Sequence, residues 1–187
     1  MFRTFIAVKI EPHSYLLDLM SLCIERLQDE FVKWVEPENM HLTLKFLGNT
    51  SSEQVEKIKE YFENDIKQNS GFSFNLTGLG FFKSGGQPRV IYSGIVDYQE
   101  LKNLYDQIEN NMFQVGFEKD SRKFNPHLTL GRIKSLKNKR LLFDLVEKFR
   151  NEKIQMVEVK EVILYQSILK PEGPTYKPLK KVRLNEV

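Results

Sequence analysis

The 187-residue sequence predicts a bilobal fold that mixes helices and strands, built from two copies of a β-α-β-α-β unit. Segments rich in β-branched and aromatic residues alternate with segments whose apolar residues recur every three or four positions, the spacing of one helix face. The order of strands and helices in residues 1–86 recurs in residues 87–187, and the tetrapeptide His-Leu-Thr-Leu stands in both halves, at 41–44 and 127–130. A repeat of both pattern and spacing indicates a duplicated unit.

The first unit begins with a strand, a helix and a second strand. Residues 5–10 are apolar and β-branched, and Pro12 ends this strand because proline has no amide hydrogen for a sheet. In residues 14–30 the apolar side chains recur at helical spacing and share one face. Residues 40–47 alternate polar and apolar with period two until Gly48, which is typical of a half-buried strand.

A second helix and a third strand complete this unit. Thr50 and Glu53 have the spacing of a capping box, in which two side chains bond the backbone at a helix start. The apolar residues of 55–66 continue that helix, and residues 72–82 return to a strand. The segment 84–88, which contains two glycines and a proline, is typical of a turn rather than a linker.

The second unit repeats this order. Asp97 and Glu100 form a second expected capping box. The expected strands are residues 89–96, 124–132 and 159–169, and the expected helices carry apolar stripes over 101–112 and 141–149. Because nothing between the units resembles a linker, we predict one bilobal domain over residues 1–187, with pseudo-repeats at about 1–86 and 87–187.

The composition excludes several classes of protein. Lys and Arg number 28 against 25 Asp and Glu, and the net charge of +3 is too small to indicate a duplex-DNA-binding protein. The single cysteine, Cys23, excludes an internal disulfide and a cysteine-based zinc site, and fits a reducing cytoplasm. No apolar run approaches the ~18 residues of a membrane span, and charges interrupt residues 1–9, where a signal peptide needs an apolar core. We therefore expect a cytoplasmic protein that does not bind membranes.

The two His-Leu-Thr-Leu tetrapeptides are the strongest functional signal. On a strand, residues i and i+2 point to the same face, so His41 lies beside Thr43 and His127 beside Thr129. A pseudo-twofold axis between the units would bring these polar faces together across a cleft. Because histidine titrates near neutrality, one ring can take a proton from an attacking oxygen while the other protonates a leaving oxygen. Threonine hydroxyls can bind phosphate oxygens, so this set of side chains predicts phosphodiester hydrolysis.

Other candidate groups have simpler explanations. The third histidine, His13, follows Pro12 at a helix start, where polar residues are ordinary. Cys23 lies on the apolar stripe of the first helix, which predicts a small buried side chain. Zinc commonly takes three or four protein ligands, and neither tetrapeptide has a third histidine or a carboxylate at ligand spacing. We therefore expect no metal and no cofactor.

The segments around both tetrapeptides resemble the two-histidine (2H) phosphoesterases, which are named for paired His-x-Thr-x motifs. The likeness is strongest to the LigT-like RNA 2′,3′-cyclic phosphodiesterases, also called 2′-5′ RNA ligases. The segments that carry it are residues 3–8, 38–48, 124–132, 164–169 and 173–176. This resemblance implies a bilobal α+β fold in which two antiparallel sheets line a central cleft, with the helices on the outside. The first and last strands then share one lobe, so that the lobes interleave the two units.

The resemblance also implies a reaction, which is the metal-independent opening of a 2′,3′-cyclic phosphate at an RNA 3′ end to a 2′-phosphomonoester. His41 matches the family's proton donor, which protonates the leaving 3′ oxygen. His127 matches the proton acceptor, which activates water. The two motifs are nearly symmetric, so their chemistry alone does not assign these roles.

Arg132 is a further candidate for binding phosphate, because a guanidinium can bind two oxygens at once and the family often carries an arginine here. Strict alternation from His127 turns position 132 away from the cleft, whereas a bulge at Gly131 would turn it back. The equivalent residue of the first unit is Phe46, so that the cleft would be cationic on one side only. The sequence leaves both orientations of Arg132 open.

The expected partner is RNA with a 2′,3′-cyclic phosphate end, and transfer-RNA fragments are one candidate pool. Exposed aromatic rings can stack on a base, and basic side chains can follow the backbone. The candidates are Phe81, Phe82, Phe124 and Tyr165 for stacking, and Arg122, Lys134, Lys137, Lys139 and Arg140 for the backbone. Core packing explains most phenylalanines, and a solvated helix face explains the basic cluster equally well.

Two other functions remain open from the sequence. The same cleft could cleave 2′-5′ linkages, or run the reaction backward as a 2′-5′ RNA ligase that joins a cyclic phosphate to a 5′-hydroxyl. A non-catalytic module could instead bind RNA ends. No heptad pattern indicates an oligomer, and we expect a monomer.

Overall fold

The structure is a computed structural model that describes residues 1–170 and 173–186. Its strands are β1 (Phe2–Lys9), β2 (Phe31–Trp34), β3 (His41–Thr50), β4 (Phe72–Ser84), β5 (Gln87–Val96), β6 (His127–Ser135), β7 (Lys153–Val159), β8 (Glu161–Lys170) and β9 (Gly173–Arg183). Its α-helices are α1 (Ser14–Arg26), α2 (Ser52–Asn64), α3 (Gln99–Val115) and α4 (Lys139–Lys148), with short 3-10 turns at Pro37–Asn39 and Ile66–Gln68. The sequence predicts these four helices and six of these strands, but not β2, β7 or β9.

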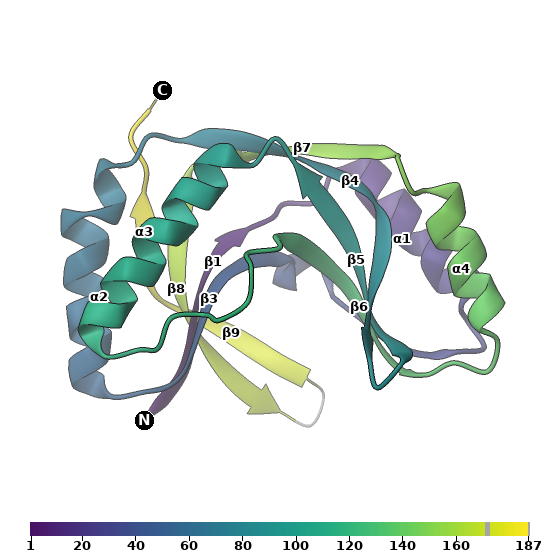
Figure 1. The fold of residues 1–187 in the computed structure, drawn as a ribbon, viewed down its shortest axis with the longest axis horizontal. Coiled ribbons are helices and arrows are strands. Elements are labelled where there is room, and N and C mark those ends of the chain that lie inside the picture. Colours follow the sequence, from purple (N-terminus) through teal and green to yellow (C-terminus); the bar gives the residue numbers. More distant parts are fainter. Residues whose placement is uncertain (171–172, 187) are drawn as a thin grey trace.

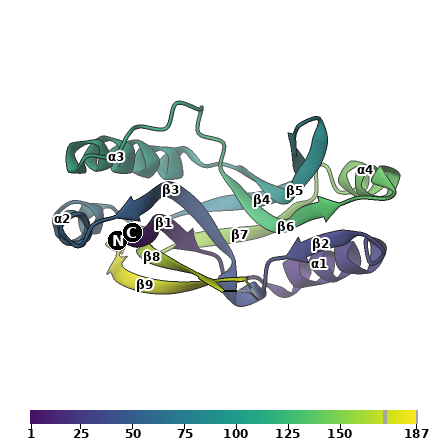
Figure 2. The same cartoon turned by 90° about the horizontal axis from the view of Figure 1, so that it is seen from below.

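The described strands form two sheets, in which all neighbouring strands pair antiparallel. One sheet has the order β3-β1-β8-β9 and the other the order β2-β6-β5-β4-β7. In Figures 1 and 2, α2 and α3 lie at one end of the molecule and α1 and α4 at the other, with the strands between them. The predicted α+β class with two antiparallel sheets is confirmed, whereas the duplication of the unit stays a prediction.

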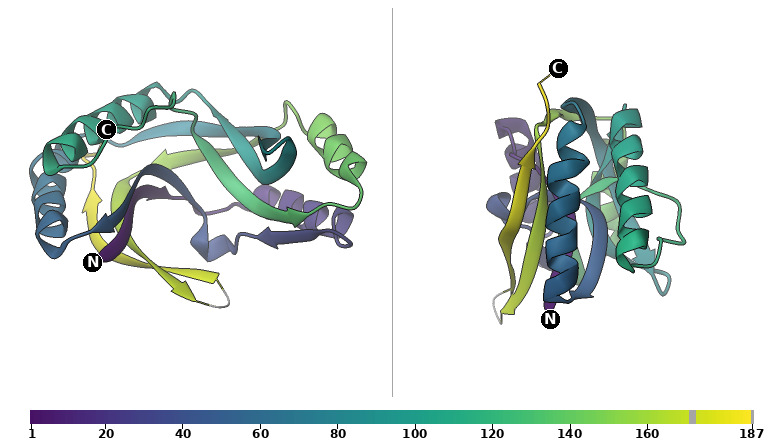
Figure 3. Two further views of the ribbon diagram at one scale, coloured as in Figure 1. Left: turned by 60° about the horizontal axis from the view of Figure 1, so that its bottom comes forward. Right: turned by 90° about the vertical axis from the view of Figure 1, so that its left-hand side faces the viewer.

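Both sheets contain strands from both halves of the sequence. The first sheet combines β1 and β3 with β8 and β9, which are the last strands of the chain. Figure 3 shows the hairpin of β8 and β9 extending beyond the other strands of this sheet. Within the described residues, none of the helices combines the length and the apolar composition that crossing a membrane requires.

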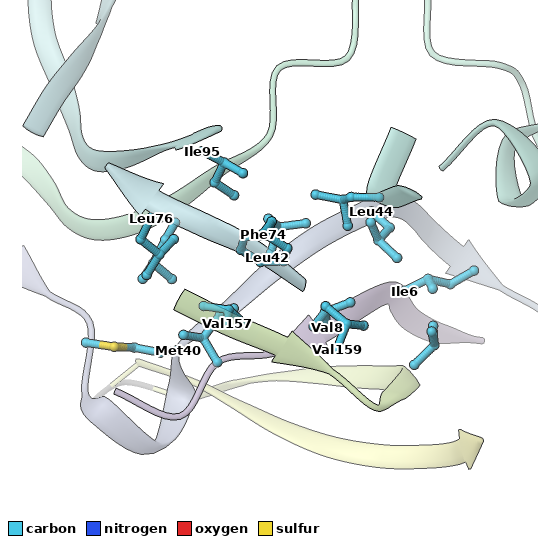
Figure 4. Packing of buried hydrophobic residues seen from close by; sticks show 14 of the residues in the cluster. Ile6, Val8, Met40, Leu42, Leu44, Phe74, Leu76, Ile95, Val157 and Val159 are labelled. Carbon is cyan, nitrogen blue, oxygen red and sulfur yellow. The ribbon is translucent and has the colours of Figure 1, made fainter. Parts of the chain in front are cut away.

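The hydrophobic core joins the two sheets. Figure 4 shows apolar side chains of both sheets meeting in one cluster. These buried side chains include Ile6, Val8, Leu42 and Leu44 from the first sheet, and Phe74, Leu76, Val157 and Val159 from the second. Each such side chain contributes roughly 1.5–3 kcal/mol when it is fully buried. The cluster therefore fixes which face of β3 turns inward and leaves the opposite face, with His41, for a functional site.

A β-bulge interrupts β6 at the last residue of its tetrapeptide. Ile91 and Tyr92 are neighbours on β5, but they pair with Gly131 and Thr129 on β6. Leu130 is therefore an extra residue on β6, and the alternation of faces shifts by one position after it. The shift changes the face to which every later side chain of β6 points.

A matching bulge lies at the last residue of the β3 tetrapeptide. Ile6 and Ala7 are neighbours on β1, but they pair with Lys45 and Thr43 on β3. Leu44 is the extra residue here and occupies the same position in its tetrapeptide as the bulged leucine of β6. Both strands consequently change their alternation at the same point.

Gly131→Val is expected to destabilise the protein, because a Cβ at this position would lie 2.9 Å from the side chains of both Trp34 and Val32 on β2. Overpacking of this kind costs about 1–3 kcal/mol of unfolding free energy. Urea denaturation followed by the fluorescence of Trp34 measures the loss. Ser135→Val on the exposed end of β6 is the control, and its effect should stay within about 0.5 kcal/mol. Equal stability of the two variants would contradict the packing argument.

Both predicted capping boxes differ from the structure. Helix α2 begins with a capping box one residue later than predicted, between Ser51 and Gln54. Thr50 is instead the last residue of β3 and is fully buried. Before α3, Asp97 has a φ of 57° and its carboxylate accepts a hydrogen bond from the Asn75 side chain, so it does not cap the helix. Long-range pairing with strands therefore overrides the local signal at both positions.

Candidate active site

A cleft of about 760 Å³ lies between strands of the two sheets. Its lining includes His41 and Thr43 from β3, and His127 and Thr129 from β6. The loop that precedes β6 and the hairpin of β8 and β9 supply further parts of the wall. The topology thus brings both tetrapeptides, which lie far apart in the sequence, to one site.

Each histidine is held by a backbone carbonyl two residues earlier. The Nδ1 atom of His41 lies 2.7 Å from the carbonyl oxygen of Asn39, and that of His127 lies 2.9 Å from the carbonyl oxygen of Asn125. A carbonyl oxygen only accepts hydrogen bonds, so Nδ1 carries a proton and donates it in both rings. In each ring, Nε2 is the nitrogen left to gain and lose a proton during chemistry.

Burial lowers the pKa of both histidines below the ordinary value of 6.5. The positive charge of Arg132 lowers both pKa values further, whereas the hydrogen bonds to the carbonyls oppose the shift. Without a bound anion, both rings are therefore mostly neutral at pH 7. A phosphate in the cleft would raise both pKa values and favour a protonated ring.

Aromatic rings pack around both histidines. The ring centroids of Phe5 and Tyr176 each lie 5.0 Å from that of His41. The centroid of Phe82 lies 4.7 Å from that of His127, and the two rings are nearly perpendicular. These contacts shield part of each imidazole from water and, together with the carbonyls, restrict its orientation.

The structure turns Arg132 into the cleft and so selects one of the two orientations that the sequence leaves open. The extra residue Leu130 shifts the alternation, and the side chain two positions later points to the same side as His127. In β3 the matching bulge turns Phe46 into the cleft, where this side chain is 69% exposed. The cleft therefore receives a cation, Arg132, after the β6 bulge and an exposed aromatic ring, Phe46, after the β3 bulge.

The predicted stacking residues divide into two groups. Phe82 and Phe124 line the cleft. Phe81 instead stacks on a phenylalanine of α4, and Tyr165 stacks on Phe5 with a centroid distance of 5.2 Å. Phe46, the exposed ring that follows the β3 bulge, also lines the cleft, and the sequence pattern did not single it out for stacking.

The basic residues predicted to follow the RNA backbone lie partly inside and partly outside the cleft. Arg122 lines the cleft, whereas Lys134, Lys137, Lys139 and Arg140 are exposed side chains outside its lining. Sequence reasoning missed Arg3 and Lys123, which line the cleft as well. Among the described residues of the lining, four cations therefore face a single carboxylate, that of Asp120. This excess of positive charge attracts an anionic ligand.

The remaining chemically reactive side chains lie elsewhere. His13 is exposed at the start of α1, outside the lining of the cleft. Cys23 is buried, as predicted, and burial raises the pKa of its thiol to about 12. In the part of the chain that the structure describes, no group of three or more His, Cys, Asp and Glu side chains is arranged to hold a metal ion.

Comparison with known proteins adds independent information on this cleft. The family described as LigT like Phosphoesterase matches residues 11–92 and 96–176. An RNA 2′,3′-cyclic phosphodiesterase from Archaeoglobus fulgidus is 40% identical over 178 residues, which cover 95% of this chain and 98% of the relative. One from Thermotoga maritima is 35% identical over 179 residues, which cover 95% and 92%.

The fold agrees with that of solved structures. A crystal structure of a protein from Thermus thermophilus superposes with a TM-score of 0.77 at 23% identity, and 98% of each chain is covered. The crystal structure of E. coli LigT in its apo form gives a TM-score of 0.69 at 24% identity with the same coverage. Because the family match spans most of the sequence, the chain belongs to the LigT-like (2H) phosphoesterases.

Proposed function

We propose that the protein hydrolyses the 2′,3′-cyclic phosphate at the 3′ end of RNA to a 2′-phosphomonoester, without a metal or cofactor. The relatives from Archaeoglobus and Thermotoga, which align with nearly the whole chain, carry the name of this activity. The observation that carries the proposal is the pair of histidines in one cleft, each with Nδ1 bonded to a carbonyl and a threonine two residues later.

In the proposed reaction, Nε2 of His127 takes a proton from a water molecule, whose oxygen attacks phosphorus. The bond from phosphorus to the 3′ oxygen breaks, its electron pair stays on that oxygen, and His41 gives the oxygen its Nε2 proton. An in-line displacement needs the base and the acid on opposite sides of phosphorus, which suits histidines from two different sheets. Thr43, Thr129 and Arg132 bind the non-bridging oxygens as negative charge builds on them.

This assignment orients the nucleoside within the cleft. The leaving 3′ oxygen belongs to the ribose, so the ribose lies on the side of His41 and the attacking water on the side of His127. The exposed ring of Phe46 lies on the same strand as His41 and offers a stacking surface to the base. The cations of the lining then face the phosphates of the RNA.

A comparison of substrates tests the proposed function. An RNA oligonucleotide that ends in a 2′,3′-cyclic phosphate should be opened with a far higher kcat/KM than a 2′-5′-linked dinucleotide is cleaved. Equal or faster cleavage of the 2′-5′ linkage would favour the alternative phosphodiesterase. Joining of the cyclic end to an added 5′-hydroxyl RNA would favour the ligase. Tight binding of the cyclic end without turnover would favour an RNA-end-binding module.

We also propose the substrate pool, the compartment and the oligomeric state in which the reaction takes place. Transfer-RNA fragments with cyclic ends are the candidate substrates, and the reaction is placed in the cytoplasm. The cleft is formed by one chain, so the active protein is proposed to be a monomer. Sedimentation at the concentration of the kinetic assay tests this state, and a dimer there would contradict it.

A further inference from the structure

A buried ion pair connects the strand of the first histidine with α3. The Nζ atom of Lys45 on β3 lies 2.5 Å from Oε1 of Glu109, and the two side chains are only 5% and 8% exposed. Removing two such charges from water costs several kcal/mol each, and apolar residues of similar size are often as stabilising or more so. The pair therefore needs an explanation other than stability.

Both partners also hold the loop between α3 and β6, residues 116–126, here called the α3–β6 loop. Lys45 Nζ donates a second hydrogen bond, 2.9 Å long, to the backbone carbonyl of Glu118. The second carboxylate oxygen of Glu109 accepts the backbone N–H of Asp120 at 2.8 Å. The ion pair is thus a clamp that holds the loop from two sides, with one bond from each partner.

The clamped loop runs from α3 beside β3 to the start of β6 (Figures 1 and 3). Its cations Arg122 and Lys123 line the cleft. Near its end lies Asn125, whose carbonyl accepts the Nδ1 proton of His127. The loop therefore carries both RNA-facing charges and the group that orients one histidine.

The other histidine does not depend on this loop. The carbonyl that accepts from His41 belongs to Asn39, in the 3-10 turn Pro37–Asn39. A second anchor of the loop is Phe124, which stacks on Tyr105 of α3 with a centroid distance of 4.0 Å. Arg122 lies in the loop between the residues held by the clamp and Phe124, and its side chain is exposed.

The matching bulge of β6 shows that such a strand does not require a charged residue at this position. The residue that corresponds to Lys45 in the second unit is Gly131, which packs against β2 and forms no ion pair. The clamp is therefore present on one side of the cleft only. The bulge turns residue 45 inward, and α3 and the α3–β6 loop supply the groups that the Lys45 ammonium binds.

We propose that Lys45 and Glu109 are positioning residues, which hold the α3–β6 loop so that its cations face the RNA and its Asn125 carbonyl orients His127. The part that concerns RNA rests on the proposed function. The part that concerns His127 is a property of the folded protein alone, so it can be tested even if the activity differs from the one proposed.

An NMR titration of His41 and His127 tests the clamp directly. The bond to Asn125 raises the pKa of His127, so a loosened loop lowers it. Lys45→Met and Glu109→Gln should therefore both lower the pKa of His127. If only the lost charges acted on His127, the two variants would shift its pKa in opposite directions, because one removes a cation and the other an anion. Opposite shifts would overturn the proposal.

The double variant Lys45→Met/Glu109→Gln removes both charges and serves as the neutral test. It should lower the pKa of His127 and leave that of His41 unchanged. The pKa shift of His127 should be about as large as in either single variant, because each single substitution already releases the loop. Equal shifts of both histidines, or no shift of His127, would contradict the assignment. Far-UV circular dichroism of each variant reports whether the overall fold persists.

Kinetics on two substrates test the role toward RNA. With a cyclic-ended oligonucleotide, the clamp variants should raise KM by about threefold to tenfold, in the range of two weakened surface charge contacts, and should reduce its dependence on salt. KM for a nucleoside 2′,3′-cyclic monophosphate should stay unchanged. The matched control is Lys102→Met, which breaks an exposed ion pair to Asp106 on the same helix and should change neither KM. Equal increases for both substrates would assign the clamp a general structural role and overturn the proposal.

Discussion

His41→Ala and His127→Ala are each expected to lower kcat by about 10²–10⁴-fold, the usual contribution of a general acid or base. In His127→Ala, no group remains to take the proton of the attacking water. In His41→Ala, the 3′ oxygen must leave as an unprotonated alkoxide. Both rings already have Nδ1 bonded to a carbonyl, so alanine removes the one nitrogen that faces the chemistry.

Steady-state kinetics with a cyclic-ended RNA measure these losses. His13→Ala is the matched control, because this third histidine is exposed outside the cleft and should retain full activity. The double variant His41→Ala/His127→Ala should lose much less than the product of the two single losses, since the residues act as a unit. Unchanged turnover in His127→Ala together with weaker RNA binding would show that His127 binds RNA and is not the general base.

The second large effect is expected in the pH dependence of kcat/KM. The base must be neutral, so activity falls about tenfold per pH unit below the pKa of His127; the acid must be protonated, so it falls similarly above the pKa of His41. Burial and Arg132 lower both pKa values in the free protein. The bell-shaped profile should therefore be centred below pH 6.5. A flat profile from pH 5 to 9 would contradict two-histidine catalysis.

Arg132→Met should move this profile in a defined direction. Removing the cation raises the pKa of both histidines, so both limbs of the bell move to higher pH. Loss of charged hydrogen bonds to phosphate, at about 1.5–3 kcal/mol, should also lower the maximal kcat/KM by about 10- to 100-fold. The control is Arg140→Met on α4, outside the cleft lining, which should leave both the centre and the height of the bell unchanged. A shift to lower pH in Arg132→Met would refute the electrostatic argument.

The sequence pattern predicts the parts of the site that precede the bulges. His41 and His127 each share a face with the threonine two residues later, because alternation is intact from the histidine to the threonine. Arg132 and Phe46 follow the bulges, and strict alternation places both on the wrong face. Gly131 allows a bulge on β6, but the equivalent residue of β3 is Lys45, and it is the pairing with β5 and β1 that fixes the register of both strands.

The three strands that the sequence does not reveal all lie at sheet edges. Strands β2 and β7 end the second sheet, and β9 ends the first. An edge strand pairs on one side only, so it tolerates polar residues and proline, and its pattern is weak. Strand β9, for example, contains Pro178 and several lysines.

The clamp on the α3–β6 loop has no sequence signature. Lys45 and Glu109 are 64 residues apart and meet only through the tertiary fold. Lys45 follows a tetrapeptide in a strand that alternates polar and apolar, so the pattern alone makes it an ordinary polar residue. The bulge turns its side chain inward, to the buried side of β3.

The most direct test of two-histidine hydrolysis is the product formed from a nucleoside 2′,3′-cyclic monophosphate in excess EDTA and ¹⁸O-labelled water. Two-histidine hydrolysis gives nucleoside 2′-phosphate as the sole product, with one ¹⁸O on phosphorus and a rate that EDTA does not reduce. Formation of 3′-phosphate would show that the 2′ oxygen leaves and would reverse the geometry proposed for His41. Loss of turnover in EDTA would show that a metal takes part, and would contradict two-histidine hydrolysis.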